Sequence, residues 1–122
     1  MAAILLFGLE NDMADSLALI LRRMHHTVRI TNSMEAVLRQ PGTQVLFVGG
    51  DHDHYRETIR LLVSKLPSTA VVVVNRLPES ARWLDALELG AADYCGAPFE
   101  TTQISWLLEG VMRGIEIKER AA

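Results

Sequence analysis

The chain has 122 residues, enough for one domain with a single hydrophobic core. Apolar residues make up 49% of it and charged residues 22%, as in an ordinary soluble globular protein. The net charge of −3 gives no electrostatic reason to expect binding to nucleic acid or to an anionic membrane. The single cysteine, Cys95, excludes an internal disulfide and fits a reducing compartment, so we expect a cytoplasmic protein.

Short apolar runs alternate with segments of helical periodicity along the whole chain. The runs predict strands, and the segments whose apolar residues recur every three or four positions predict amphipathic helices. Five strands alternating with five helices indicate a parallel sheet with helices on both faces. Right-handed crossovers and a polar second strand favour the flavodoxin-like order 2-1-3-4-5. The predicted strands are Ile4–Phe7, a half-solvated edge strand around Val28 and Ile30, Gln44–Val48, Val71–Val74 and a short strand around Tyr94-Cys95.

Capping residues set the expected helix boundaries. We expect His25-His26 to end the first helix as a solvated cap, and Pro41-Gly42 to stop the second. In the fourth helix we expect Trp83, Leu84 and Leu87 as the apolar positions and Gly90 as the residue just after the end. The predicted helix starts are Asn11 or Asp12 for the first, Asn32 with Glu35 as a capping box for the second, Pro78-Glu79 for the fourth, and Thr101 or Thr102 for the last.

Two motifs near the end of the chain, read with this order of elements, resemble the receiver domain of bacterial response regulators. Residues 89–94, Leu-Gly-Ala-Ala-Asp-Tyr, and 97–99, Ala-Pro-Phe, look like the family's Gly-Ala-Asp-Asp-Tyr and Lys-Pro-Phe signature. The resemblance covers nearly the whole chain and implies a CheY-like (βα)5 receiver of two-component signal transduction. It implies one domain over residues 1–122, with 4–115 as its core and 116–122 as a tail or the start of a linker.

A working receiver of this family needs five groups at the carboxyl ends of its strands. Two acids after the first strand bind Mg²⁺, and an aspartate after the third accepts the phosphoryl group. A Ser or Thr after the fourth strand and a Lys before the proline bind the phosphoryl oxygens, because the charge on a transferring phosphoryl group must be neutralised. All five are replaced in this chain, so we interpret it as a degenerate pseudo-receiver. The replaced positions are Gly8, Leu9, Gly49, Asn75 and Ala97.

Several acids remain near the expected pocket and leave a second interpretation open, a relocated site with Asp51 as phospho-acceptor and Glu10 as metal ligand. An acceptor shifted by two residues would lie about 6–7 Å along an extended chain, far outside catalytic tolerance. Residues 51–54, Asp-His-Asp-His, also have side chains that bind divalent metals. Sequence neighbours rarely converge on one ion, so we expect Asp53 and the others to be loop residues, with no metal site and no cofactor.

Two features of receiver signalling do survive in the sequence. Tyr94 matches the aromatic residue that active receivers of the family turn inward, although simple core packing explains it equally well. Ala97-Pro98 matches the family's cis peptide bond before proline. If Tyr94 is a switch, something other than phosphate must control it, because Asn75 replaces the hydroxyl residue.

The last predicted helix carries Trp106, Gly110 and Gly114 at a spacing of four residues. A large aromatic residue beside two glycines lets another backbone approach closely, which predicts a surface for a protein partner or for a homodimer. The other interpretation is that Trp106 covers an edge of the domain's own core.

We therefore expect a non-enzymatic signalling module that acts independently of phosphorylation. It would regulate an output domain or partner by protein–protein contact, in two-component-type signal transduction or transcription control, with no direct contact to nucleic acid or membrane. Two alternatives stay open: a small-ligand sensor that uses the emptied pocket around Gly8, Gly49 and Asn75, and a residual phospho-acceptor at Asp51.

Overall fold

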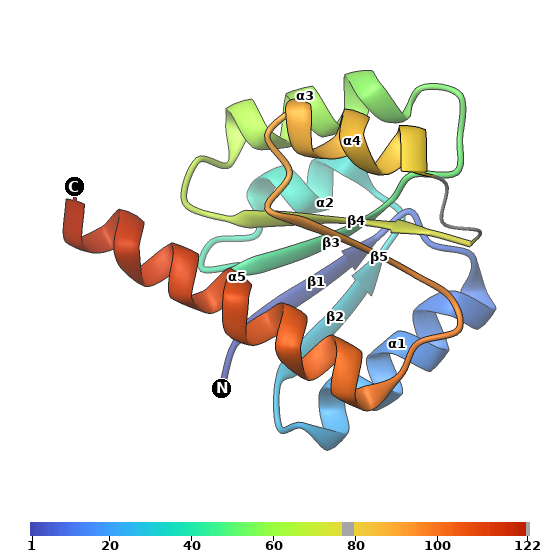
Figure 1. Cartoon of the computed structure of the whole chain (residues 1–122), viewed down its shortest axis with the longest axis vertical. Helices are drawn as coiled ribbons and strands as arrows, with labels where there is room; N and C mark the ends of the chain where they lie inside the picture. The colour runs from blue at the N-terminus through green and yellow to red at the C-terminus, as the bar shows by residue number, and fades with distance from the viewer. Residues whose placement is uncertain (77–79, 122) are drawn as a thin grey trace.

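Five parallel strands form one sheet in the order β2-β1-β3-β4-β5 (Figure 1). This computed structural model describes residues 1–76 and 80–121, without the side chains of residues 80–83. The predicted fold class and strand order are confirmed, and the predicted strand ends differ from the observed ones by at most one residue. The strands are β1 (Ala3–Phe7), β2 (Thr27–Thr31), β3 (Val45–Gly49), β4 (Ala70–Asn75) and β5 (Asp93–Gly96).

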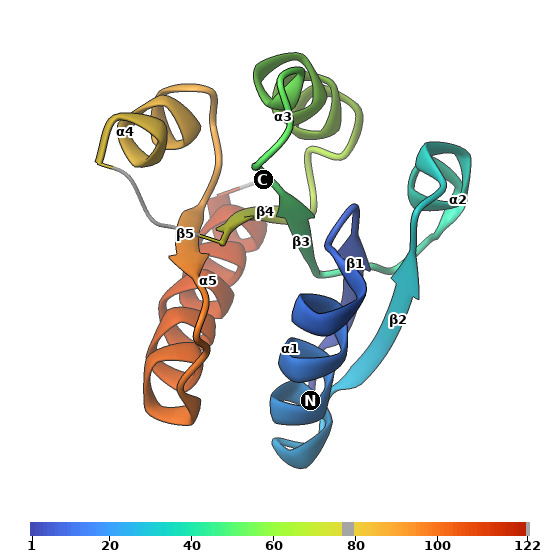
Figure 2. The ribbon, with the colours of Figure 1, turned by 90° about the vertical axis from the view of Figure 1, so that its right-hand side faces the viewer.

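The helices lie in two layers, one on each face of the sheet (Figures 1 and 2). α1 (Asn11–Arg23) and α5 (Thr101–Ala121) cover one face, and α2 (Met34–Arg39), α3 (Tyr55–Lys65) and α4 (Ser80–Glu88) cover the other. Residues 116–121, expected as a tail or linker start, form the last turns of α5. No helix in the described part of the chain is long and apolar enough to cross a bilayer.

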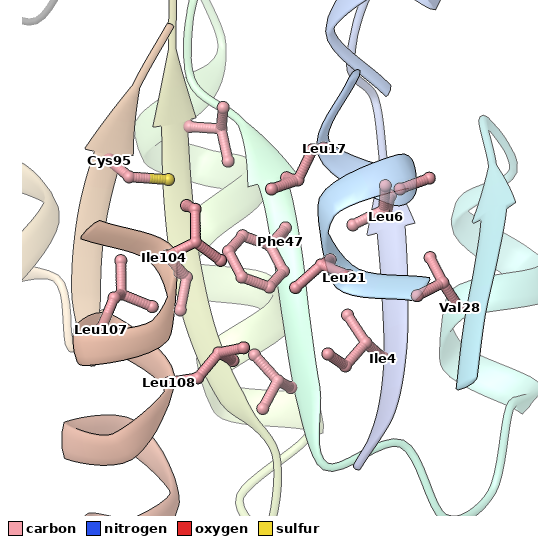
Figure 3. Packing of buried hydrophobic residues seen from close by; sticks show 14 of the residues in the cluster. Ile4, Leu6, Leu17, Leu21, Val28, Phe47, Cys95, Ile104, Leu107 and Leu108 are labelled. Atoms are coloured by element: carbon pink, nitrogen blue, oxygen red, sulfur yellow. The ribbon is translucent and has the colours of Figure 1, made fainter. Parts of the chain in front are cut away.

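Strand side chains alternate between these two layers, as the period of two in a β-strand requires. Leu6 of β1 and Phe47 of β3 pack against Leu17 of α1 and Ile104 of α5 (Figure 3). Their neighbours in the strands, such as Leu46, pack under α2, α3 and α4 instead. Both faces of the central strands are therefore dry, which explains why β3 and β4 are almost continuously apolar.

Cys95 belongs to the layer between the sheet and α5 and is fully buried (Figure 3). This burial raises the pKa of the Cys95 thiol to about 12, because the low-dielectric core disfavours the thiolate. The side chain therefore acts as a small core residue, and its burial disfavours a nucleophilic role at neutral pH.

Two predicted helix starts need correction, and one lies outside the described residues. The cap of α2 is Ser33, whose hydroxyl accepts a hydrogen bond from the amide of Ala36 at 3.1 Å, so the predicted capping box at Asn32 is wrong. Ser33 caps the helix because its short side chain reaches the amide three residues later in the sequence, the usual spacing for an N-cap. Glu10 occupies the N-cap of α1 without a side-chain cap, so Asn11 is the first helical residue. Pro78-Glu79 lie outside the described part.

The predicted apolar face of α4 is also wrong for the two positions that can be checked. Leu84 is 57% exposed and Leu87 is 38% exposed, whereas Ala86 is fully buried, so the helix lies on the sheet through a small side chain. Asp85, beside it, accepts a hydrogen bond from the Tyr55 hydroxyl of α3 at 2.8 Å and fixes this orientation. Gly90 does follow the helix end, with φ +102°, as predicted. The side chain of Trp83 lies outside the described atoms.

The end of α1 differs from the expected solvated cap. His25 adopts a left-handed conformation with φ 68° and reverses the chain. His26 is half-buried, and its Nδ1 accepts a hydrogen bond from the amide of Ala2 at 3.0 Å. Because an accepting Nδ1 must be unprotonated, this contact and burial both favour neutral His26, and burial lowers its pKa.

Candidate functional site

The loops after β1, β3 and β4 meet at the carboxyl ends of these strands, where parallel sheets place their working sites. Here the backbones of two loops approach each other too closely for a side chain at the end of β3. A Cβ atom added to Gly49 would overlap the carbonyl oxygen of Gly8. Gly8 itself has φ +72°, a conformation that residues other than glycine rarely adopt. Gly8 and Gly49, two of the three positions where the family carries carboxylates, therefore favour glycine for reasons of backbone geometry.

Leu9, the second position expected of a metal-binding acid, belongs to the hydrophobic core. Its side chain is buried and packs with Met13 and other residues of the α1 layer. It cannot coordinate a metal. Ala97, at the position of the family's lysine, is half-buried against the same core layer and offers no cation.

A cation does reach the pocket, from a residue that the sequence interpretation missed. Arg76, directly after β4, extends across the carboxyl edge to the loop that follows β1. Its Nη2 lies 2.9 Å from Oε2 of Glu10 and 3.0 Å from Oδ1 of Asp12. Nη1 donates a further hydrogen bond to Oδ2 of Asp12 at 3.3 Å. Glu10 and Asp12 are therefore neutralised from within the chain.

The electrostatics of this cluster agree with its geometry. Hydrogen bonding by Arg76 lowers the pKa of Asp12 below its ordinary value, because it favours the charged carboxylate. In turn, hydrogen bonds to Asp12 and Glu10 raise the pKa of the Arg76 guanidinium. All three side chains are substantially exposed, so the cluster orders two loops more than it stabilises the fold.

Asp51, in the loop after β3, is held by two donors at the end of β4. Its Oδ1 accepts a hydrogen bond from Nδ2 of Asn75 at 3.1 Å, and its Oδ2 accepts one from the backbone amide of Arg76 at 2.8 Å. Asn75 is 1% exposed, and its Oδ1 has no hydrogen-bond partner among the described residues. Sequence reasoning placed Asn75 and Asp51 near one pocket, and the structure shows them in direct contact.

The other polar residues of this loop do not assemble into a site. His52 and Asp53 are exposed, and His54 lies 3.9 Å from Glu57 on the surface of α3. Within residues 1–76 and 80–121, no group of three His, Cys, Asp or Glu side chains could hold a metal ion. The arrangement therefore gives no support to a metal site at residues 51–54.

A small cavity remains where the receiver pocket would be. It measures about 230 Å³ and is lined by Gly8, Leu9, Met13, Gly49 and Val74 together with the polar Glu10, Asp51 and His52. Small-molecule sites usually occupy about 300–1,000 Å³, so this cavity is smaller than those sites. Its size disfavours the alternative of a small-ligand sensor.

Tyr94 of β5 and the Ala97-Pro98 bond that follows it are the two features expected of a receiver switch. The Ala97-Pro98 peptide bond is cis, as predicted. The ring of Tyr94 is half-buried and packs with the α2, α3 and α4 layer, and its hydroxyl oxygen is buried. Tyr94 thus lies inward, in a position compatible with either role predicted for it.

The outer surface of α5, unlike the small cavity at the carboxyl edge, is exposed to solvent. Trp106 is 72% exposed, so it does not cover the domain's own core. A Cβ atom added to Gly110 or Gly114 would meet nothing within 4 Å outside the helix. Beside these glycines lies a groove of about 650 Å³, between the second half of α5 and the amino ends of β4 and β5.

No protein-family model matches the sequence, and no curated protein matches it. Solved structures do. NtrX from Brucella abortus, in complex with ADP, superimposes with a TM-score of 0.88 at 20% sequence identity, over 98% of this chain and 28% of NtrX. The chain therefore spans less than a third of the length of NtrX.

Two shorter proteins match over nearly their whole lengths. A response regulator from Thermotoga maritima has a TM-score of 0.81 at 18% identity, over 93% of this chain and 99% of that one. A CheY-like receiver domain protein from Methanospirillum hungatei has a TM-score of 0.78 at 16% identity, over 100% of this chain and 99% of that one. The chain has the fold of a CheY-like response-regulator receiver domain.

Proposed function

We propose that this domain is a pseudo-receiver, a non-enzymatic signalling module that acts through protein–protein contact without phosphoryl transfer. It keeps the receiver fold and has lost every group at the five positions where the family carries its phosphotransfer chemistry. The losses are Gly8, Leu9, Gly49, Asn75 and Ala97.

The observation that carries this proposal is the contact between Gly49 and Gly8. A receiver lacking only its acceptor aspartate would still have space for that side chain. In this chain the carbonyl oxygen of Gly8 occupies the place of a Cβ at residue 49. The backbone has therefore closed over the acceptor position, and a single back-substitution cannot reopen it.

The residual-acceptor alternative requires Asp51 to act as a nucleophile. Both of its oxygens already accept hydrogen bonds, from Asn75 and from the amide of Arg76. Two acids that could hold the metal needed to prepare a phosphoryl donor, Glu10 and Asp12, are already paired with Arg76. We therefore favour a fixed structural role for Asp51.

Arg76 links the loops at the carboxyl edge permanently, whereas a phosphorylated receiver would link them only while it carries the phosphoryl group. Its backbone amide binds the loop after β3, and its side chain binds the loop after β1. Three loops at the carboxyl edge are thereby joined without metal or phosphate. This supports a module whose state is set by binding to a partner or output domain, in the cytoplasm, with the outer face of α5 as its contact surface.

The test is exposure of the purified chain to Mg²⁺ with a small acyl phosphate, or with beryllofluoride, followed by intact-mass spectrometry and tryptophan fluorescence. A receiver with its acceptor aspartate intact serves as the positive control. We expect no added phosphoryl group and no fluorescence change in this chain. Stoichiometric phosphorylation of Asp51 or Asp53 would overturn the proposal.

A further inference from the structure

The start of β1 is held in place by the turn between α1 and β2. Ala2, directly before β1, is 2% exposed, so its backbone amide has little access to water. That amide donates a hydrogen bond to Nδ1 of His26 at 3.0 Å. The amide of Thr27 donates one to the carbonyl oxygen of Ala2, also at 3.0 Å. Both backbone polar groups of Ala2 are therefore satisfied by the turn, beside which Figure 2 shows the amino terminus.

The backbone of the turn fixes the position of His26. His25 adopts φ 68° and reverses the chain after α1. The amide of His26 then donates a hydrogen bond to the carbonyl oxygen of Leu21 at 3.1 Å, and its ring is half-buried. The turn therefore directs Nδ1 of His26 onto the amide of Ala2.

The contact between His26 and Ala2 requires a neutral imidazole. An Nδ1 atom that accepts a hydrogen bond carries no proton, so the ring proton is on Nε2. In the imidazolium form both ring nitrogens are donors, and two donors cannot bond to each other. Protonation therefore removes the acceptor of a buried amide, and a buried amide without a partner is costly.

Burial and the nearest titratable groups both favour the neutral ring. Burial is the largest cause that lowers the pKa of His26, and the amino group of Met1 and the imidazole of His25 lower it further. These effects agree in direction with the hydrogen bond from Ala2, which is an independent observation. At neutral pH the folded chain therefore holds His26 uncharged.

The elements around the turn supply no anion that would stabilise a charged His26. In the part of the chain that the structure describes, β1 has no charged side chain, and β2 has only Arg29. The last turn of α1 carries two cations, Arg22 and Arg23, and the acids of this helix lie in its first half. Gln44, before β3, contacts the start of β1 through a neutral amide at 3.0 Å.

We propose that the contact between His26 and Ala2 is a pH-sensitive switch, which holds the amino-terminal end of β1 at neutral pH and releases it in mild acid. Release would affect the sheet directly, because β1 lies between β2 and β3 and its pairing with β2 begins at Ala3 and Thr27. The switch lies at the opposite end of β1 from the loops of the carboxyl edge, so it does not depend on the proposed function.

The pH range of the switch follows from the lowered pKa of His26. A group that is harder to protonate in the folded chain contributes its full stability above the ordinary value, about 6.5 for histidine. That contribution is lost as the pH falls from this value through the folded pKa. We therefore expect the response below about pH 6.5.

The first test is hydrogen exchange of the untagged chain, followed by NMR at pH 7.5 and pH 5 and corrected for the intrinsic exchange rates. Protection of the Ala2 and Thr27 amides should fall about tenfold in acid, the change that one pH unit of titration produces. His26→Asn should keep protection at both pH values, because its Oδ1 takes the place of Nδ1 and cannot be protonated. His26→Ala should lack protection at both.

His25→Asn is the matched control, since asparagine also tolerates a positive φ and the exposed ring of His25 does not contact Ala2. It should respond to pH as the wild type does. Wild-type protection that is equal at pH 7.5 and pH 5 would overturn the proposal. A response of His26→Asn as large as that of the wild type would overturn it as well, because another group would then be the sensor.

The second test needs no variant. The ¹⁵N chemical shifts of the His26 ring in the wild type report which nitrogen carries the proton. At pH 7.5 we expect the proton on Nε2 and an unprotonated Nδ1, and we expect the ring to titrate below the ordinary value for histidine. A proton on Nδ1 at pH 7.5, or a ring that titrates above the ordinary value, would refute the switch.

Discussion

Acidic side chains at the carboxyl edge of the sheet are paired within the chain, whereas the outer face of α5 is exposed to solvent. At the edge, three acids are paired within the chain: Glu10 and Asp12 bind Arg76, and Asp51 binds Asn75. On α5, an exposed indole and two bare glycine positions face solvent. One region is closed by its own residues, and the other remains open.

The difference is clearest in the glycines of the two regions. Glycines occur in both regions, but for different reasons. At Gly49 the missing side chain lets two loops of the same chain touch, so the glycine serves the fold. At Gly110 and Gly114 the space above the backbone is empty, and each glycine weakens the helix by roughly 1 kcal/mol relative to alanine. Under the proposed function, a contact from outside the domain offsets that cost.

The largest expected effect is that of Gly49→Ala. The new methyl group would overlap the carbonyl oxygen of Gly8, a backbone atom that cannot turn away, so we expect a loss of about 3 kcal/mol in the free energy of unfolding. Urea denaturation followed by circular dichroism measures this. Gly49→Asp should be at least as unstable and should not become phosphorylated.

The matched control is the same substitution in open space, Gly114→Ala. It should not destabilise the monomer, because its methyl group meets nothing within 4 Å outside the helix. Equal stability of Gly49→Ala and the wild type would show that the two loops can separate, and the closed edge would no longer distinguish the regions.

Most of the fold was predictable because it follows from the periodicity of apolar residues. The valines of β4 and the alternation in β2 gave the strands and, with the rules of connection, their order. The prediction that Leu84 and Leu87 face the sheet was wrong because spacing alone does not say which side of a helix is buried. The contact of Asp85 with Tyr55, thirty residues away in the sequence, decides that orientation.

The candidate site was predictable in what it lacks and not in what replaces it. The five substituted positions could be read by spacing from each strand. Arg76 could not, because it meets Glu10 and Asp12 across more than sixty residues of sequence. One signal was available: an arginine directly after a buried strand lies at the same edge as acids after another strand. The close approach of the Gly8 and Gly49 backbones could not be predicted, because the glycine at position 49 is its only sign in the sequence.

A smaller effect should separate the glycines of α5 from Gly49. Gly110→Ala should raise the free energy of unfolding by about 0.5–1 kcal/mol, because alanine has the higher helix propensity and its methyl group meets nothing within 4 Å outside the helix. Thermal melts measure this. A Gly110→Ala variant less stable than the wild type would show that the space beside this glycine is not open.

The closed edge should open chemically when its cation is removed. Arg76→Met keeps much of the side chain's length but leaves Glu10 and Asp12 without their partner. Two free carboxylates on one loop are a weak oxygen site for a divalent cation, with an affinity on the order of 10⁻³ M. We expect millimolar Mg²⁺ to raise the melting temperature of Arg76→Met and to leave that of the wild type unchanged. An equal response of both proteins would show that Arg76 does not exclude the metal.

Acid should give the smallest effect, and its sign follows from the lowered pKa of Asp12. Because hydrogen bonding by Arg76 depresses that pKa in the folded state, the pairing stabilises the protein above the ordinary value of about 3.9 and is lost as the pH falls through the folded value. The wild type should therefore melt at a slightly higher temperature than Arg76→Met at pH 7, and the difference should shrink below pH 4. Glu35→Gln is a suitable control, since it removes another exposed ion pair, with Arg39, far from the edge. A difference between wild type and Arg76→Met that does not shrink as the pH falls below 4 would mean that Arg76 orders the loops by packing and not by charge.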